Sequence, residues 1–297
     1  MSYKKFLIVL ISFFLIAPLL YADNQNIPEA EQQINDFSIA GYGEKGKKTW
    51  ELSAQTADVF NEAIRLKAIE GSLYGEKEDV KLTADKGDFD KAENKVHLEE
   101  NVTVSTSSGS KLTTDTLDWD RKNQLVSTKD MVNIEKDDMV TTAQGATGEP
   151  NLNKMTLEKD VTVKINPAPA QGEKQTANKN KITINCDGPV QIDYQKNIAT
   201  FNNNVLVDNN DLQIYSDAMD IYFITSGTDN TSEKNSAPMG SKIDKIIARG
   251  NVKIVRGENI SYSDEAVYIA AEKKITLAGK PKLVIYSTED LNASFGN

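Results

Sequence analysis

Apolar and polar residues alternate along most of this chain. The alternation runs through INDFSIAGY at 34–42, KKTWELSAQTADVF at 47–60 and AIRLKAIEGSLY at 63–74. A period of two places every second side chain on the same face of a β-strand. The pattern therefore predicts one strand after another, and only the stretch 56–65 leaves room for a turn of helix.

Two phrases recur along the sequence at short intervals. The first phrase occurs as KLTADKGDFD at 81–90, KLTTDTLDWD at 111–120 and QIYSDAMDIY at 213–222. The second phrase occurs as NKVHLEENVTV at 94–104, NKMTLEKDVTV at 153–163 and NIATFNNNVLV at 197–207. Short polar turns separate the phrases, and such turns join antiparallel neighbours because parallel strands need a longer crossover. The repeats thus predict a stacked antiparallel structure and argue against a parallel β-helix.

The alternation changes parity inside the first phrase. In KLTTDTLDWD the residue Leu112 has one parity, whereas Leu117 and Trp119 have the other, and the change falls at Thr114-Asp115. A change of parity indicates a bulge or a sharp bend, at which a long strand passes from one sheet to the facing sheet. We expect Asp115 and Asp217 to accept backbone N–H groups at such bends, which is a commoner role for a repeated turn aspartate than catalysis.

Strands that bend at a common point predict an all-β fold, an antiparallel β-jelly roll or open V-shaped β-sandwich. One apolar set is expected to face its interior: Val96, Leu98, Val102, Val104, Leu112, Leu117, Trp119, Val161, Val163, Phe201, Val205, Val207, Ile221 and Ile254. These side chains either interdigitate into a dry core, as in most sandwiches, or stay partly apart and hold an apolar ligand. All but Ile254 are our candidates for a lipid groove.

Two polar segments interrupt the repeats. Residues 166–180 contain two prolines and no large apolar side chain, which predicts a boundary between a domain at 34–166 and a domain at 181–290. Residues 226–241 predict a long surface loop. Because both domains share the same phrases, one kind of sheet is expected to continue across them.

The N-terminus carries the pattern of an export signal. Lys4 and Lys5 precede an apolar run at 6–20, and Ala22 is a small residue at which a signal peptidase cuts. The run is short for a membrane-spanning helix, which needs about 20 apolar residues. Residues 1–22 are therefore either a cleaved signal peptide or a membrane anchor, and in both cases the rest of the chain is exported.

Composition narrows the chemistry. The net charge is −10 and no basic stripe is present, which argues against nucleic-acid binding. A single cysteine, Cys186, and a single histidine, His97, offer too few ligands for a usual metal site, and no nucleophile with a base can be named. We therefore expect no cofactor, no metal and no enzymatic activity. The alternative to a ligand-carrying role is a structural or adhesive surface protein with a filled core.

The outermost strands are predicted to be open to partners. An array of this kind exposes unpaired backbone groups at its first and last edges. The first strand at 34–42 carries no obvious block, and Pro281 stands before an apolar last strand at 282–286 without covering its edge. Both edges are expected to pair with partner proteins by strand addition.

Taken together, these features resemble a known family. A hydrophobic N-terminal segment followed by this β-repeat array is similar to the bridge proteins of lipopolysaccharide export, LptC and LptA, with their OstA-like fold. The stretches 36–60, 109–128 and 151–165 resemble LptC, whereas GPVQIDYQKNIATFNNNVLV at 188–207 resembles the LptA unit. The chain departs from the family in joining both parts in one polypeptide.

The resemblance implies a function. In that family an apolar β-jelly-roll groove carries the acyl chains of lipopolysaccharide across the periplasm toward the outer membrane. Protomers join edge to edge, and an inner-membrane ABC transporter supplies the energy. The resemblance thus implies a periplasmic location, held at the inner membrane if residues 1–22 are kept, with lipopolysaccharide and other Lpt proteins as partners.

Overall fold

A computed structural model describes residues 30–43, 46–75, 78–136, 138–149, 154–166, 181–193, 195–209, 211–224 and 243–284. The strands of this part are β1 Gln32–Tyr42, β2 Lys48–Val59, β3 Ala63–Leu73, β4 Val80–Asp90, β5 Lys95–Thr106, β6 Lys111–Asp120, β7 Leu125–Lys136, β8 Met139–Gly148, β9 Lys154–Ile165, β10 Ile182–Cys186, β11 Val190–Asp193, β12 Ile198–Asn209, β13 Leu212–Phe223, β14 Ile243–Arg256, β15 Asn259–Ile269, β16 Lys274–Ala278 and β17 Lys282–Val284. The predicted all-β fold is confirmed, but the stretch 56–65 holds two strands and a turn instead of a helical turn.

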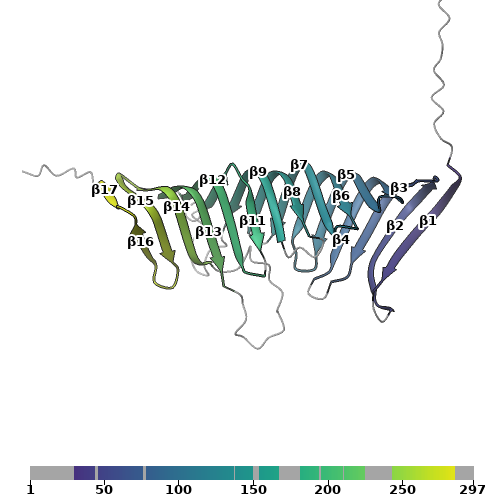
Figure 1. Cartoon of the computed structure of the whole chain (residues 1–297), viewed down its shortest axis with the longest axis horizontal. Coiled ribbons are helices and arrows are strands. Elements are labelled where there is room, and N and C mark those ends of the chain that lie inside the picture. Colours follow the sequence, from purple (N-terminus) through teal and green to yellow (C-terminus); the bar gives the residue numbers. More distant parts are fainter. Residues whose placement is uncertain are drawn as a thin grey trace, which may run out of the picture.

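The strands form one sheet in which chain neighbours pair antiparallel, from β1 at one end to β16 and β17 at the other (Figure 1). The short strands β10 and β11 lie end to end between β9 and β12, as one interrupted strand. The strands β16 and β17 lie along β15 in the same way. Since β9 pairs with β10 and β11, the sheet continues across the segment 166–180, as the shared phrases predict.

Several strands bend at a residue with left-handed backbone geometry. Each of the three copies of the second phrase places an asparagine or aspartate at this point, and the related stretch DKIIARGNVKI at 244–254 does the same, with φ values of 55°, 50°, 53° and 48° in chain order. These residue types tolerate the left-handed region better than most. Each is followed directly by a valine that is at most 1 % exposed. The four pairs are Asn101-Val102, Asp160-Val161, Asn204-Val205 and Asn251-Val252.

The aspartates of the first phrase lie beside these bends. The pairing register between β6 and β7 shifts between Thr113 and Asp118, which confirms the bulge predicted at Thr114-Asp115. The donor to Asp217 differs from the expectation. Its carboxylate accepts a hydrogen bond of 2.8 Å from the side-chain amide of Asn251 on β14, instead of a backbone N–H. The carboxylate thereby fixes the bend of the neighbouring strand.

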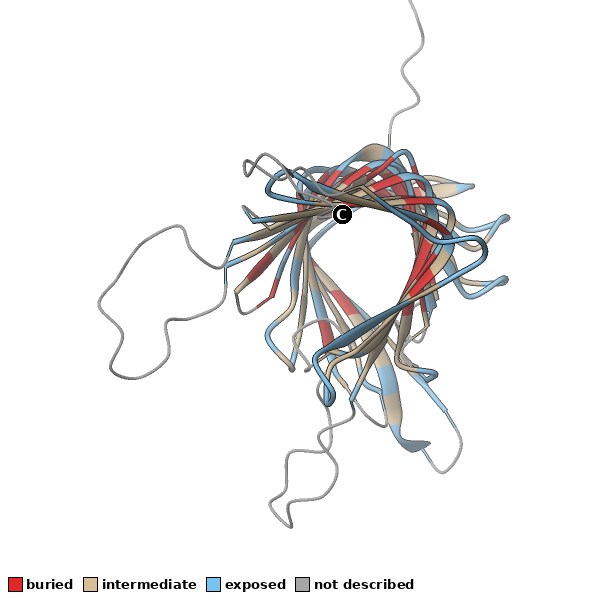
Figure 2. Cartoon of the chain, turned by 90° about the vertical axis from the view of Figure 1, so that its left-hand side faces the viewer, coloured by how far each residue is buried: buried red, intermediate tan, exposed pale blue. Residues whose placement is uncertain are grey.

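The bends divide the sheet lengthwise into two limbs. The half of the sheet that includes the turn between β1 and β2 is called the first limb. The half that includes the turn between β2 and β3 is called the second limb. Viewed along the array, the strands curve around a common axis, and their buried segments line this curve (Figure 2). This arrangement is the predicted open β-jelly roll.

The buried residues form two clusters along the axis. One cluster comprises side chains of β2 to β6, from Leu52 to Leu117, and the other comprises side chains of β7 to β15, from Val132 to Ala266. The division between them falls between β6 and β7. The apolar core is therefore continuous across the segment 166–180, where the sequence predicts a domain boundary.

Several predicted features lie outside the described residues: the hydrophobic segment 1–22, most of the boundary segment, the loop 226–241 and the end of the last strand after Val284. In the part of the chain that the structure describes, no helix is long and apolar enough to cross a membrane.

Gly250 provides a test of the bend geometry. Its φ is +75°, and a Cβ atom there would lie 2.3 Å from Oδ2 of Asp217. Gly257 has a φ of +58° with nothing within 4 Å of such an atom. We expect Gly257→Ala to cost about 1 kcal/mol through backbone strain alone, and Gly250→Ala to cost clearly more in urea denaturation. Equal losses would contradict a bend fixed by Asp217.

Candidate functional site

The predicted inward residues lie in rows that cross the sheet from strand to strand. One row follows the first limb, one follows the bends, and two follow the second limb. In that order the rows contain Val104, Leu112, Val163 and Val207; Val102, Val161 and Val205; Leu98, Leu117 and Phe201; and Val96, Trp119 and Ile221. The parity reading of the sequence thus brings these side chains to one face.

Burial separates the candidates into two kinds. Most are buried, for example Val102 and Phe201, which are 0 % and 2 % exposed. Half-buried positions remain at Val104, Leu112, Trp119 and Val207, each packed against a core cluster. The interior is accordingly well packed over much of its length, and three of the four half-buried candidates lie on β5 and β6.

An apolar cavity of ≈ 70 Å³ lies between the two limbs. Side chains of the first limb from β3 to β6 form one wall, and side chains of the second limb from β6 to β9 form the other. The lining residues are Leu73, Val80, Leu82, Val104, Leu112, Leu117, Val126, Ser127, Thr128, Ala146, Thr147, Gly148 and Met155. Three groove candidates, Val104, Leu112 and Leu117, therefore line a real space in the interior.

The cavity adjoins an interruption of the sheet. Backbone pairing between β6 and β7 stops after Thr113 and resumes at Asp118. Within this gap the buried hydroxyls of Thr114 and Thr128 lie 3.3 Å apart in a hydrogen bond that joins the two strands. Leu117 belongs to the same unpaired stretch and lines the cavity. This is also the place where the two core clusters separate.

Some of the residues that line the cavity were not predicted from the sequence. Met155 occupies the same place in the second phrase as Val96, so the repeat alone could have identified it. Val126 and Ala146 lie outside the repeated phrases, and small residues such as Ala146 give no clear parity signal. That Val126 and Ala146 line the cavity follows only from the way in which the two limbs face each other in the structure.

An aromatic cluster joins the limbs beside the first core cluster. Trp50 lies in the first limb, and the rings of Trp50 and Trp119 meet edge to face with centroids 6.3 Å apart. The guanidinium carbon of Arg121 lies 4.2 Å from the ring centroid of Trp50 and 5.6 Å from those of Phe89 and Trp119. The sequence reasoning identified Trp119 alone. We call these four residues the Arg121 cluster.

Arg121 is an unusual cation in this protein. Its Nη1 donates a hydrogen bond of 2.9 Å to Oδ1 of Asn94. Burial lowers the pKa of its guanidinium. Among the described residues no carboxylate lies within ion-pair distance of it. The Nε1 of Trp119 is also a buried donor without a hydrogen-bond acceptor in the described part of the chain.

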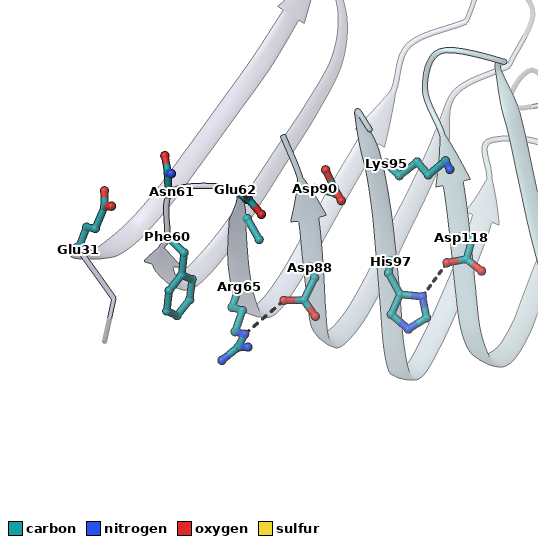
Figure 3. A pocket seen from close by; sticks show the side chains of 11 residues that line it. Glu31, Phe60, Asn61, Glu62, Arg65, Asp88, Asp90, Lys95, His97 and Asp118 are labelled. Carbon is teal, nitrogen blue, oxygen red and sulfur yellow. Dashed lines mark hydrogen bonds and ion pairs between the residues drawn. The ribbon is translucent and has the colours of Figure 1, made fainter. Parts of the chain in front are cut away.

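A second hollow lies elsewhere, among mostly charged and polar residues. It measures ≈ 690 Å³ and is lined by side chains between Glu31 and Asp118 (Figure 3). Arg65 pairs with Asp88 across strands at 3.6 Å, and Nδ1 of His97 lies 2.6 Å from Oδ1 of Asp118. All four side chains are more than 40 % exposed, so these cross-strand pairs form a solvated outer face and are no argument for a built site.

The lone cysteine behaves as a small core residue. Cys186 is 5 % exposed, and burial raises the pKa of its thiol, which keeps it protonated at neutral pH. In the described ranges no group of His, Cys, Asp and Glu side chains is arranged to hold a metal ion.

The fold and the apolar interior define the class: an antiparallel β-jelly roll with an apolar face between its two limbs. Comparison with protein families supports this assignment. The family described as lipopolysaccharide-assembly, LptC-related, matches residues 6–166, and the family of the LptA or LptD N-terminal lipopolysaccharide transport protein matches residues 183–296. No curated protein matches the chain.

The first match spans more than half of the 297 residues, and the chain therefore belongs to the LptC-related family. The order of the two matches confirms the resemblance read from the sequence, with an LptC-like part followed by an LptA-like part. Both families consist of transport proteins.

Proposed function

We propose that this protein carries lipopolysaccharide through the periplasm along the interior between its two limbs. The observation that supports this most is the apolar cavity beside β6, which is lined by groove candidates from both limbs. The rows that contain these candidates continue along the strands to β13. Acyl chains that enter at the cavity can follow one apolar face along the whole array.

The energetics suit a conduit. Each CH₂ group removed from water contributes about 0.8 kcal/mol, so a lipid with several acyl chains is held firmly. Movement along rows of similar apolar residues exchanges one contact for another of the same kind. The cavity of ≈ 70 Å³ holds the volume of about two water molecules, so the limbs must separate when a chain enters.

The exposed edges of the first and last strands suit the binding of partner proteins. Among the described strands β1 pairs with β2 alone, and its Ile34, Ile39 and Tyr42 are 37 %, 36 % and 65 % exposed. At the other end Ile275 of β16 and Leu283 of β17 are 42 % and 60 % exposed. We propose that these edges pair with other Lpt proteins, and that one end receives lipid from the inner-membrane ABC transporter.

The N-terminal segment sets the location in this proposal. If residues 1–22 are kept, the protein is tethered to the inner membrane; if they are removed, it is a soluble bridge. The part from 34 to 166 then serves as the LptC-like domain and the part from 181 to 290 as the LptA-like domain. Chemistry on a substrate is not required, and we propose no enzymatic role.

One observation favours the alternative of a structural protein with a filled core. Most groove candidates are buried in the two clusters, and the cavity occupies a small share of the interior. A sandwich that stays closed would bind no lipid. Uptake of lipid therefore decides between the two functions.

Native mass spectrometry of the full-length chain from cells that make lipopolysaccharide tests the proposal. We expect a bound mass that contains the acylated disaccharide. Leu112→Asp places a charge in the cavity wall and is expected to reduce the bound fraction at least about ten-fold, because an unpaired buried charge is costly.

Met131→Asp is the matched control, since Met131 is an apolar residue of β7 that is 53 % exposed. It should leave the bound fraction unchanged. A protein that carries no lipid and takes up none when lipopolysaccharide is added would overturn the proposal and favour the structural alternative.

A further inference from the structure

The Arg121 cluster combines a guanidinium without a carboxylate partner and an indole N–H without any acceptor in the described part of the chain. The Arg121 guanidinium faces three aromatic rings, and its described hydrogen bond goes to the amide oxygen of Asn94. The Nε1 of Trp119 is buried without an acceptor. Both groups donate hydrogen bonds, so the chemical complement of the cluster is an oxygen acceptor, and an anionic one matches the charge.

Two of the other three arginines of the chain pair with carboxylates, and the third, Arg256, is exposed. Arg65 pairs with Asp88, and Arg249 pairs with Asp220 at 2.5 Å. The net charge of the chain is −10, so a half-buried arginine without a carboxylate at ion-pair distance stands out against an acidic background. Aromatic rings stabilise such a cation and also keep it in place.

The cluster lies next to the cavity. Leu117 and Trp119 have the same parity on β6, and Leu117 lines the cavity while Trp119 belongs to the cluster. Two residues of strand span about 7 Å. A ligand with an anionic head at Arg121 could therefore place an apolar chain directly into the cavity.

We propose that Arg121, held by Trp50, Phe89 and Trp119, binds a phosphate group on the sugar headgroup of the lipid whose acyl chains occupy the interior. The inference rests on the proposed function and adds to it a site for the charged end of the cargo. Because Trp50 comes from the first limb and Trp119 from the second, the same site holds the two limbs together beside the lipid.

The chain reports on this site through its own fluorescence. It contains two tryptophans, and both belong to the cluster. The purified full-length chain, kept in solution by a tryptophan-free amphipol, is titrated with a bisphosphorylated acylated diglucosamine and with the same lipid after both phosphates are removed. Native mass spectrometry counts the bound lipid in parallel.

We expect the phosphorylated lipid to bind at least about ten-fold more tightly than the dephosphorylated one, which is the range of a charge-assisted hydrogen bond. Arg121→Gln should abolish this difference while the acyl chains still bind. Arg121→Lys keeps the positive charge and should retain part of the difference, which separates loss of charge from damage to the fold.

Arg65→Gln is the matched control, because Arg65 also lies over an aromatic ring, that of Phe60 at 4.9 Å, but on the outer face and paired with Asp88. It should keep the full difference between the two lipids. If wild-type protein binds both lipids equally, or if Arg121→Gln still discriminates, the phosphate site is refuted and lipid carriage stands. If neither lipid binds, the proposed function fails together with the site.

Discussion

Phe201→Ala is expected to lower the free energy of unfolding by about 3–5 kcal/mol. Phe201 is 2 % exposed and lies in register between Val190 of β11 and Met219 of β13, which are both 0 % exposed. Removal of the ring leaves a cavity that these neighbours fill only in part. Urea denaturation followed by circular dichroism measures the loss.

The loss should be local as well as large. Each strand contacts its neighbours in the chain, so amide hydrogen exchange is expected to accelerate in β11 to β13 more than in β2 to β4. Tyr262→Ala is the control, since Tyr262 is 40 % exposed on β15 and should cost less than about 0.5 kcal/mol. If Phe201→Ala lowered the free energy of unfolding only slightly, the interior around β11 to β13 would have to be open and hydrated.

The sequence predicted the rows because a single rule governs them. Alternation at period two assigned Val102, Val161 and Val205 to the inner face, and all three side chains are at most 1 % exposed. The recurrence of the second phrase placed these valines at the same point in successive strands. Repetition averages out the error that a single strand would carry, so the sheet and its inner face could be predicted.

The Arg121 cluster could not be predicted in the same way. Trp50 and Trp119 lie on β2 and β6, which do not pair with each other, and they meet because the limbs of a curved sheet face each other. Contacts across limbs depend on the twist and curvature of the sheet, which alternation does not encode. The curvature of the sheet also brings Val126 and Ala146 into the wall of the cavity, which is why the sequence did not predict them there.

The donor at Asp217 illustrates a different limit. An aspartate in a repeated turn suggests a backbone donor, because local hydrogen bonds are the commonest ones at turns. The bend here is made by the neighbouring strand, whose Gly250 and Asn251 both have positive φ. The carboxylate therefore meets the Asn251 amide, a partner that is distant in sequence.

The position of the core division bears on how lipid would pass. A break at the segment 166–180 would have separated the LptC-like part from the LptA-like part, but one cluster runs from β7 to β15 across that segment. The discontinuity lies between β6 and β7, at the interrupted ladder and the cavity. If the limbs separate anywhere to admit a chain, we expect them to separate beside this cavity, where the pairing of β6 with β7 is interrupted.

Ala146→Leu is expected to block lipid without loss of stability. Ala146 is 6 % exposed and lines the ≈ 70 Å³ cavity from β8. The larger side chain fills this space, so we expect the free energy of unfolding to stay constant or to rise by about 1–2 kcal/mol, since added apolar groups gain about 0.8 kcal/mol per CH₂. The lipid-bound fraction in native mass spectrometry should fall several-fold.

Ala143→Leu on the same strand gives the contrast. Ala143 is 0 % exposed and does not line the cavity, so three additional carbon atoms have no space and should cost about 1–3 kcal/mol. Equal destabilisation by both substitutions would show that the cavity is not usable space. Undiminished lipid in Ala146→Leu, with stability retained, would show that acyl chains do not pass beside β6. If Ala146→Leu loses lipid while its stability is retained, the fold is undamaged. The loss of lipid then comes from the filled cavity, which blocks the path of the acyl chains.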